Sequence, residues 1–177
     1  MLEFETVEVI ADIIAHGMDI PEGQIATYNP GIPPPQQQEL FIGIDITAKE
    51  VLANNIRYES RENNTDLWQL QTLQVRELVS VTIVSLDAEA HERNHEIVLA
   101  LGSTYAQQMQ EKYSLQIART PSSFTNTSGI VDSTNLNRYT IIVAIQRAYY
   151  KESTTESFDQ FQPVSLITQP ATSNSTP

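Results

Sequence analysis

The chain has 177 residues, no cysteine, and 22 acidic against 10 basic residues, which gives a net charge of −12. This length predicts one domain, and the absence of thiols excludes disulfides and cysteine-ligated metals. The acidic balance opposes phosphate binding, so we expect no specific nucleic-acid binding by the isolated chain. No apolar run approaches the ~20 residues of a membrane helix, and acids stand where a signal peptide carries Lys or Arg. We therefore expect a soluble, unexported protein.

The first forty residues predict one helix and a proline-rich loop. Apolar residues recur at helical spacing from Leu2 to His16, and Gly17 followed by Pro21 indicates where that helix stops. The stretch from Pro21 to Gln38 holds five of the nine prolines and predicts a loop, with a short strand at Gln24 to Tyr28.

The next segments predict antiparallel strands. Leu40, Ile42, Ile44 and Ile46 alternate with polar or small residues, which indicates a strand with one buried face. The strongest strand pattern is Val75 to Leu86, with Val75, Val79, Val81 and Ile83 on one face. Val51 to Tyr58 is weakly extended, Arg61 to Asp66 is a polar turn, and extended structure resumes from Trp68 to Leu86, which together predict antiparallel strands joined by a hairpin.

A second helix is predicted from Ala88 to Lys112, because apolar residues follow each other at steps of three and four. Ser85 or Asp87 can cap its N-terminus. Gly102 inside this helix suggests a close approach of its backbone to the sheet, although a merely tolerated glycine is an equal alternative.

The C-terminal third predicts two strands separated by a polar segment. Leu115 and Ile117 form a short strand, and Arg138 to Tyr150 form a long strand that is apolar on both sides. The segment from Arg119 to Asn137 has little to bury and reads as a functional or disordered loop. After Lys151 the composition turns to Gln, Ser, Thr and Pro, which predicts a tail that cannot order itself.

Together these elements predict an α+β fold, in which a mainly antiparallel sheet packs with two helices and carries long polar loops. Residues 1–150 form the domain and residues 151–177 a flexible C-terminal arm. Two strands are apolar on both faces, so either one helix covers each side of the sheet or a neighbouring subunit covers one side. Both options favour an assembly surface over a pocket.

One motif suggests catalysis. His91, Glu92, Arg93, Asn94 and His95 match H-E-x-x-H, in which two histidines one turn apart share Zn²⁺ and the glutamate polarises water. A third protein ligand is missing, and Glu111 is the nearest candidate. The buried stripe through Ile97 places His91 and Glu92 on the exposed side of the helix. The sequence therefore favours a helix surface, with a zinc hydrolase as the alternative function.

The other candidates for chemistry are weak. His16 lies at a helix C-terminus, where a cap is expected. Asp45 and Glu50 have no sequence partner for an acid–base pair, and no nucleotide-binding or nucleophile-elbow motif occurs. We expect no catalytic residue, no metal site and no cofactor.

The order of elements resembles that of the tail terminator or neck proteins of tailed bacteriophages. Three segments carry the resemblance: GIPPPQQQELFIGIDI, VRELVSVTIVSLDAEAHERNHEIVLAL and NRYTIIVAIQRAYY. The resemblance implies a small α+β subunit that forms a six-membered ring on the tail tube and joins it to the head-side connector. The Pro/Gln-rich loop and the Ser/Thr/Pro tail are longer than a minimal member needs. Another head–tail connector or tail-completion subunit is the alternative within this class.

The resemblance also implies the partners and the place of assembly. We expect a homo-oligomer, a hexameric ring, that meets tail tube, sheath or connector proteins in the virion and is assembled in the host cytoplasm. DNA passes through such a ring without specific binding. Scattered apolar residues in the polar segments are the expected interface anchors, namely Phe124, Ile130, Val131, Phe158 and Phe161.

Overall fold

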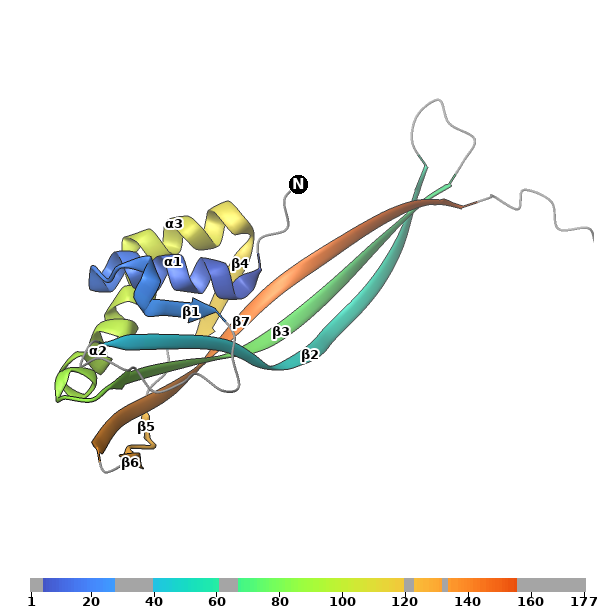
Figure 1. The fold of residues 1–177 in the computed structure, drawn as a ribbon. Helices are drawn as coiled ribbons and strands as arrows, with labels where there is room; N and C mark the ends of the chain where they lie inside the picture. Colours follow the sequence, from blue (N-terminus) through green and yellow to red (C-terminus); the bar gives the residue numbers. More distant parts are fainter. Residues whose placement is uncertain (1–4, 28–39, 61–66, 120–122, 132–133, 156–177) are drawn as a thin grey trace, which may run out of the picture.

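The computed structural model describes residues 5–27, 40–60, 67–119, 123–131 and 134–155 (Figure 1). The predicted α+β class is confirmed, since three α-helices pack on a mainly antiparallel sheet. The strand order is β1-β2-β3-β7-β4, and β5 and β6 also pair with β7. The bounds are α1 Thr6–Met18, β1 Ile25–Thr27, β2 Phe41–Ser60, β3 Leu67–Ser85, α2 Glu89–Leu101, α3 Thr104–Tyr113, β4 Leu115–Arg119, β5 Thr125–Asn126, β6 Gly129–Val131 and β7 Thr134–Thr155.

The first predicted helix is α1. Glu5 and Glu8 form a capping box at its start, in which the Glu5 N–H donates to Glu8 Oε2 at 3.3 Å. Gly17 does not stop the helix as the sequence suggested. The helix continues to Met18, and Asp19 ends it in the left-handed conformation, with φ of 54°.

The second predicted helix is two helices, and this corrects the sequence prediction. Gly102 caps the C-terminus of α2, and the Ser103 hydroxyl starts α3 by accepting the Ala106 N–H at 3.1 Å. Gly102 ends α2 and Ser103 caps the start of α3, so the chain changes direction between them. The caps expected at the start of α2 are present, because Ser85 Oγ accepts the Ala90 N–H and Asp87 Oδ1 accepts the Glu89 N–H, both at 2.9 Å.

The close backbone approach occurs at Gly17 and not at Gly102. A Cβ on Gly17 would lie 2.8 Å from Ala100 Cα and still closer to Ala100 Cβ, so α1 and α2 touch there. A Cβ on Gly102 would meet only carbonyls of its own helix, the nearest at 3.5 Å. The suggested contact between Gly102 and the sheet is therefore wrong.

β2 and β7 are longer than predicted, whereas β3 agrees with the extended segment predicted from Trp68 to Leu86. β2 runs without a break through the two segments that were expected separately, with one extra residue at Thr47 and another at Leu52 relative to β3. β3 pairs with β2 on one side and with β7 on the other along its whole length. The expected polar turn at 61–66 lies outside the described residues.

The polar segment 119–137 contains structure that its composition did not predict. β5 pairs with β7 at Thr140 and Tyr139, and β6 pairs with the first residues of β7. β7 therefore begins at Thr134 rather than Arg138, and it continues to Thr155 rather than ending at Tyr150. Backbone pairing to a long neighbouring strand holds these polar residues although they bury little. Residues 156–177 of the expected C-terminal arm lie outside the described residues.

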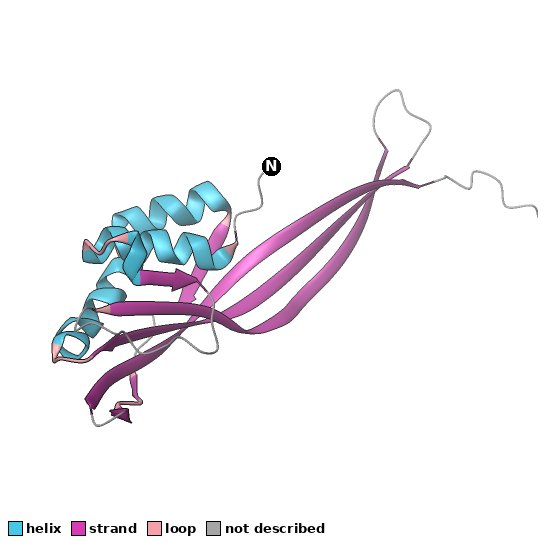
Figure 2. Cartoon of the chain, viewed as in Figure 1, coloured by secondary structure: helices cyan, strands magenta, loops and turns pink. Residues whose placement is uncertain are grey.

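The hydrophobic core lies between the helices and one face of the sheet (Figure 2). α1 contributes most of the helical side chains, and the sheet contributes alternate residues of its three long strands. The core residues of the three long strands are Ile42, Ile44, Val79, Val81, Ile83, Ile141, Val143 and Ile145, and Leu115 of β4 joins them. Their alternation was predicted for Ile42 and Ile44 and for Val79 to Ile83, and it is confirmed by exposures of 0 to 1%. The helices do not divide between the two faces.

Candidate assembly surface

The most distinctive feature of the molecule is a three-stranded ribbon that projects from the core (Figure 1). It consists of residues 51–60 of β2, 67–75 of β3 and 147–155 of β7. The register joins these strands level by level, from Val51, Val75 and Arg147 at the root to Ser60, Leu67 and Thr155 at the end. No described helix covers either face of this ribbon (Figure 2).

Large apolar side chains are exposed on both faces of the ribbon. On the face that continues the core side, Val51, Ile56 and Tyr58 are 62%, 51% and 57% exposed. On the opposite face Tyr150 is 69% exposed. Strand alternation separates the two sets, because Ile56 lies level with Lys151 whereas Tyr150 lies level with Asn55. Several large apolar side chains exposed on one short ribbon favour an interaction site there.

A buried charge cluster marks the root of the ribbon. Glu77 of β3 lies on the core side of the sheet, between Val75 and Val79. Although it is a charged residue, it is only 1% exposed. The Thr6 hydroxyl donates to Glu77 Oε2, and Lys49 Nζ lies 2.9 Å from Glu77 Oε1. Oε1 itself accepts no hydrogen bond from the described residues, so its partner is the ammonium charge rather than a well-directed donor. The cluster ties the start of α1 to the middle of the sheet.

The surroundings of Glu77 favour its ionised form. Burial alone would raise the pKa of this carboxyl, but the hydrogen bond from Thr6, the close contact with the Lys49 ammonium and the charge of Arg147 outweigh burial and lower the pKa. In return, the contact with Glu77 raises the pKa of Lys49. The cluster is therefore an ion pair at neutral pH. It opens on a hollow of about 380 Å³ whose lining adds Glu5, Ile46 and Tyr149.

Sequence reasoning did not identify Glu77. The signal was present, since a glutamate interrupts the run of β-branched residues on the buried face of the strongest strand. A charge at such a position needs a buried partner. That partner could not be named, because Thr6 and Lys49 lie 71 and 28 positions away in the sequence.

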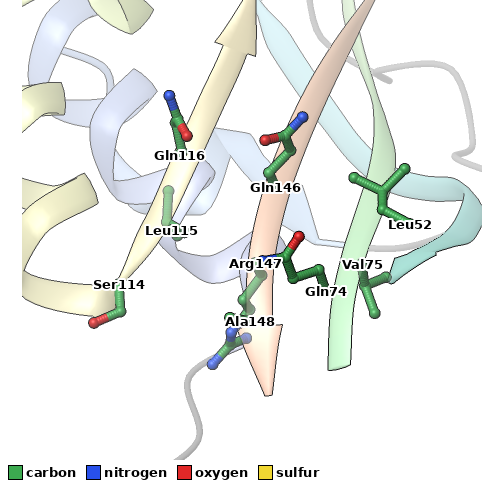
Figure 3. Close-up of a pocket in the computed structure, with 9 residues that line it drawn as sticks. All are labelled: Leu52, Gln74, Val75, Ser114, Leu115, Gln116, Gln146, Arg147 and Ala148. Atoms are coloured by element: carbon green, nitrogen blue, oxygen red, sulfur yellow. The ribbon is translucent and has the colours of Figure 1, made fainter. Parts of the chain in front are cut away.

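A second hollow, of about 300 Å³, lies where β4 begins beside the root of the ribbon (Figure 3). Gln116 and Gln146 are level neighbours on β4 and β7, and Figure 3 shows their amides at one end of the hollow with Leu52 across from them. The lining is Leu52, Gln74, Val75, Ser114, Leu115, Gln116, Gln146, Arg147 and Ala148. Among the described residues that line it, there is neither a carboxylate nor a histidine.

The expected interface anchors occupy different situations. Phe124 is half-buried and packs against the chain's own core, whereas Ile130 on β6 is 77% exposed. Val131 is the last residue of β6, and Phe158 and Phe161 lie outside the described residues. Of the two anchors whose side chains are described, one faces the core and the other is exposed. The exposed apolar residues of the ribbon were not among the predicted anchors.

The H-E-x-x-H segment lies at the start of α2. His91, Glu92 and His95 are exposed, as predicted, and His91 Nδ1 lies 2.8 Å from the Tyr139 hydroxyl. Arg93 contacts Glu89 and Glu96 and donates to the Met18 carbonyl at 2.7 Å, so it caps the C-terminus of α1. Among the described residues, no group of three His, Asp or Glu side chains is placed to hold a metal ion.

His16 lies in the last turn of α1, and its ring contacts α3. Its ring stacks on the Tyr105 ring with centroids 3.8 Å apart, and the Tyr105 hydroxyl donates to Asp12 Oδ2 at 2.9 Å. These contacts join α1 to α3. They are helix-packing contacts on the surface of the core.

A scan of protein-family models finds no match to the chain, and a search of curated protein sequences finds none either. Within the described residues, no helix is both long enough and apolar enough to cross a membrane.

Proposed function

We propose that this chain is a structural virion protein of a tailed bacteriophage, a tail terminator or neck subunit. It assembles as a ring on the end of the tail tube and joins the tube to the head-side connector. The observation that supports this proposal most strongly is the ribbon, which carries exposed apolar side chains on both faces outside the helix-covered core.

The ribbon is the part of the subunit that needs other chains. A narrow sheet is marginally stable in water unless a hydrophobic face is covered. Here the core strands obtain that cover from three helices, and the ribbon obtains none from the described residues. Neighbouring subunits and the tail tube supply the cover in the assembled ring, so protein–protein interfaces are the chemistry of this protein.

The charge of the chain agrees with this role. With a net charge of −12, the subunit repels phosphate and does not hold the genome that passes through the ring. The proposed partners are therefore further copies of the chain, in a hexamer, together with tail tube, sheath or connector proteins. The protein acts in the virion after assembly in the host cytoplasm.

Binding to isolated tail tubes tests this function. Purified chain mixed with tubes should appear as a cap on one tube end by electron microscopy, and light scattering should define the state of the free chain. An Ile56→Ser, Tyr58→Ser variant should lose capping. The matched control is Leu99→Ser, because Leu99 is 67% exposed on α2, away from the ribbon. A wild-type chain that neither self-associates nor caps tubes would refute the proposal, and one that binds only head-side connectors would assign it to the other connector class.

A further inference from the structure

The ribbon has two strand edges without a described partner. β1 pairs with β2 only at Ile42 to Ile44, so the outer edge of β2 is open from Asp45 to Ser60. β4 pairs with β7 as far as Arg147, so the outer edge of β7 is open from Ala148 to Thr155. An open edge presents a row of backbone N–H and C=O groups, and the ligand that satisfies such a row is another strand.

The outer part of each edge carries few of the features that block pairing, whereas the root of the β2 edge carries two bulges and three charged residues. Proteins usually block exposed edges with proline, several charges or very short strands. The β2 segment 51–58 contains no proline, and Arg57 is its one charged residue. The β7 segment 148–155 is also free of proline and carries Lys151 and Glu152. Both edges are long enough to add a complete strand.

The two edges are different and point the same way. β2 and β7 are both antiparallel to β3, so they are parallel to each other and lie on opposite sides of the ribbon. Copies standing side by side in a ring therefore present the β7 edge of one to the β2 edge of the next. A contact between two different surfaces repeats around a closed ring, whereas a contact between identical surfaces stops at a dimer.

We infer that the β7 edge of each subunit pairs, as a parallel strand, with the β2 edge of the next copy. This inference rests on the ring of the proposed function and names the contact that closes it. Within one chain Arg57 and Glu152 both oppose Leu70, so they lie at the same height and on the same face of the ribbon. If neighbouring copies are not shifted along the strands, Glu152 of one copy therefore lies beside Arg57 of the next. Both residues also make contacts within their own chain, and Arg57, which contacts Glu59, is 70% exposed. Opposite charges on neighbouring strands favour this register.

Single cysteines test the pairing directly, because the chain has no cysteine of its own. One preparation carries Arg57→Cys and another carries Glu152→Cys, and both are checked for native circular dichroism. Concentrated purified chains are then oxidised separately and as a mixture. We expect a disulfide-linked dimer in the mixture and none in either preparation alone. A short bis-maleimide on the same samples detects pairs whose geometry does not allow a disulfide.

A double variant with both cysteines extends the test. Within one chain these positions lie two strand spacings apart, roughly 10 Å, which is beyond disulfide reach. Oxidation should therefore give a ladder of covalent oligomers that ends at the ring number. The control pairs Arg57→Cys with Leu99→Cys, a position on α2, and should give no product.

The outcomes separate this contact from the function. Cross-linking in a single preparation, without cross-linking in the mixture, would show that like edges meet and would overturn the inference. Absence of any product with both reagents would overturn it as well. Capped tubes without cross-links would leave the proposed function standing and refute the strand pairing. Cross-links without capping would support the strand pairing and refute the proposed function.

Discussion

The core and the ribbon are built from the same three strands, yet they differ in what surrounds those strands. On β2, Ile44 is 1% exposed beneath the helices, and Ile56 on the same side of the same strand is 51% exposed. The pairing of β3 with β7 continues without a register shift from one region into the other. Pairing thus determines how far the sheet extends, and helix cover determines where it is stable. The ribbon is a sheet whose faces must be covered by other molecules, because no described helix covers them.

The same substitution at two positions of one strand gives the largest contrast. Ile44→Ala leaves a cavity in the core and should lower the free energy of unfolding by about 2–5 kcal/mol. Ile56→Ala shortens an exposed side chain and should change the free energy of unfolding by less than about 0.5 kcal/mol. Urea unfolding, at a concentration where light scattering shows single chains, measures both values. Equal losses would mean that the ribbon is already buried in the free subunit.

Glu77 lies at the boundary between the two regions. Glu77→Gln removes the charge that Lys49 neutralises and should cost about 1–3 kcal/mol at pH 7. Because folding lowers the pKa of this carboxyl from 4.5, its contribution is present above that pH and is lost as the pH falls through the lower folded value. Stability curves of wild type and variant should converge in acid.

The control for this charge is Glu50→Gln. Glu50 also forms an ion pair, 3.3 Å from Arg76, but its side chain is 62% exposed. An exposed pair contributes about 0–1 kcal/mol, so this variant should differ little from wild type across the same pH range. An equal acid dependence of the two variants would contradict the special position of Glu77.

Two glycines separate helix packing from helix propensity in the core. Gly17→Ala introduces a methyl group against Ala100 and should cost about 1–2 kcal/mol, since overpacking exceeds the gain in propensity. Gly102→Ala meets no atom of another element and should be nearly neutral. Thermal unfolding compares the two. A stabilised Gly17→Ala chain would show that α1 and α2 can separate freely.

The smallest effects are expected on the surface of the core. His91→Ala and His95→Ala should each change the unfolding free energy by less than about 0.5 kcal/mol and leave tube capping intact, because both side chains are exposed. Urea unfolding and metal analysis of the purified chain test this together. One tightly bound zinc per chain, lost in both variants along with a hydrolytic activity, would support the zinc hydrolase instead.

Local signals predicted the elements that local chemistry determines. The apolar stripe of α1, the alternation of Ile42 and Ile44, and the caps at Ser85 and Asp87 each lie within a few residues of the groups they organise. The division of α2 from α3 was missed, because the periodicity of the apolar residues continues across Gly102. The hydrogen bond from the Ala106 N–H to the Ser103 hydroxyl starts a new helix there although the apolar periodicity continues.

The remaining features depend on contacts distant in sequence. Composition placed 119–137 in a loop, but β5 and β6 form because the long strand β7 offers them an edge. Sequence alternation also showed apolar residues on both sides of β7 without showing which side the helices cover. The ribbon follows from register over three strands, and no single segment contains that information.

The two extra residues of β2, at Thr47 and Leu52, give the ribbon its direction. Each is an insertion relative to β3, and such bulges bend the strand and increase its twist. Figure 1 shows β2 turning away from the core along this stretch. Removal of Leu52 would keep every later residue on its present face, because the pairing resumes at Ala53 and Gln74. Curvature and residue orientation are therefore separately adjustable, so the angle at which the subunit reaches its neighbours can evolve by single-residue insertions or deletions while the packed interior stays the same.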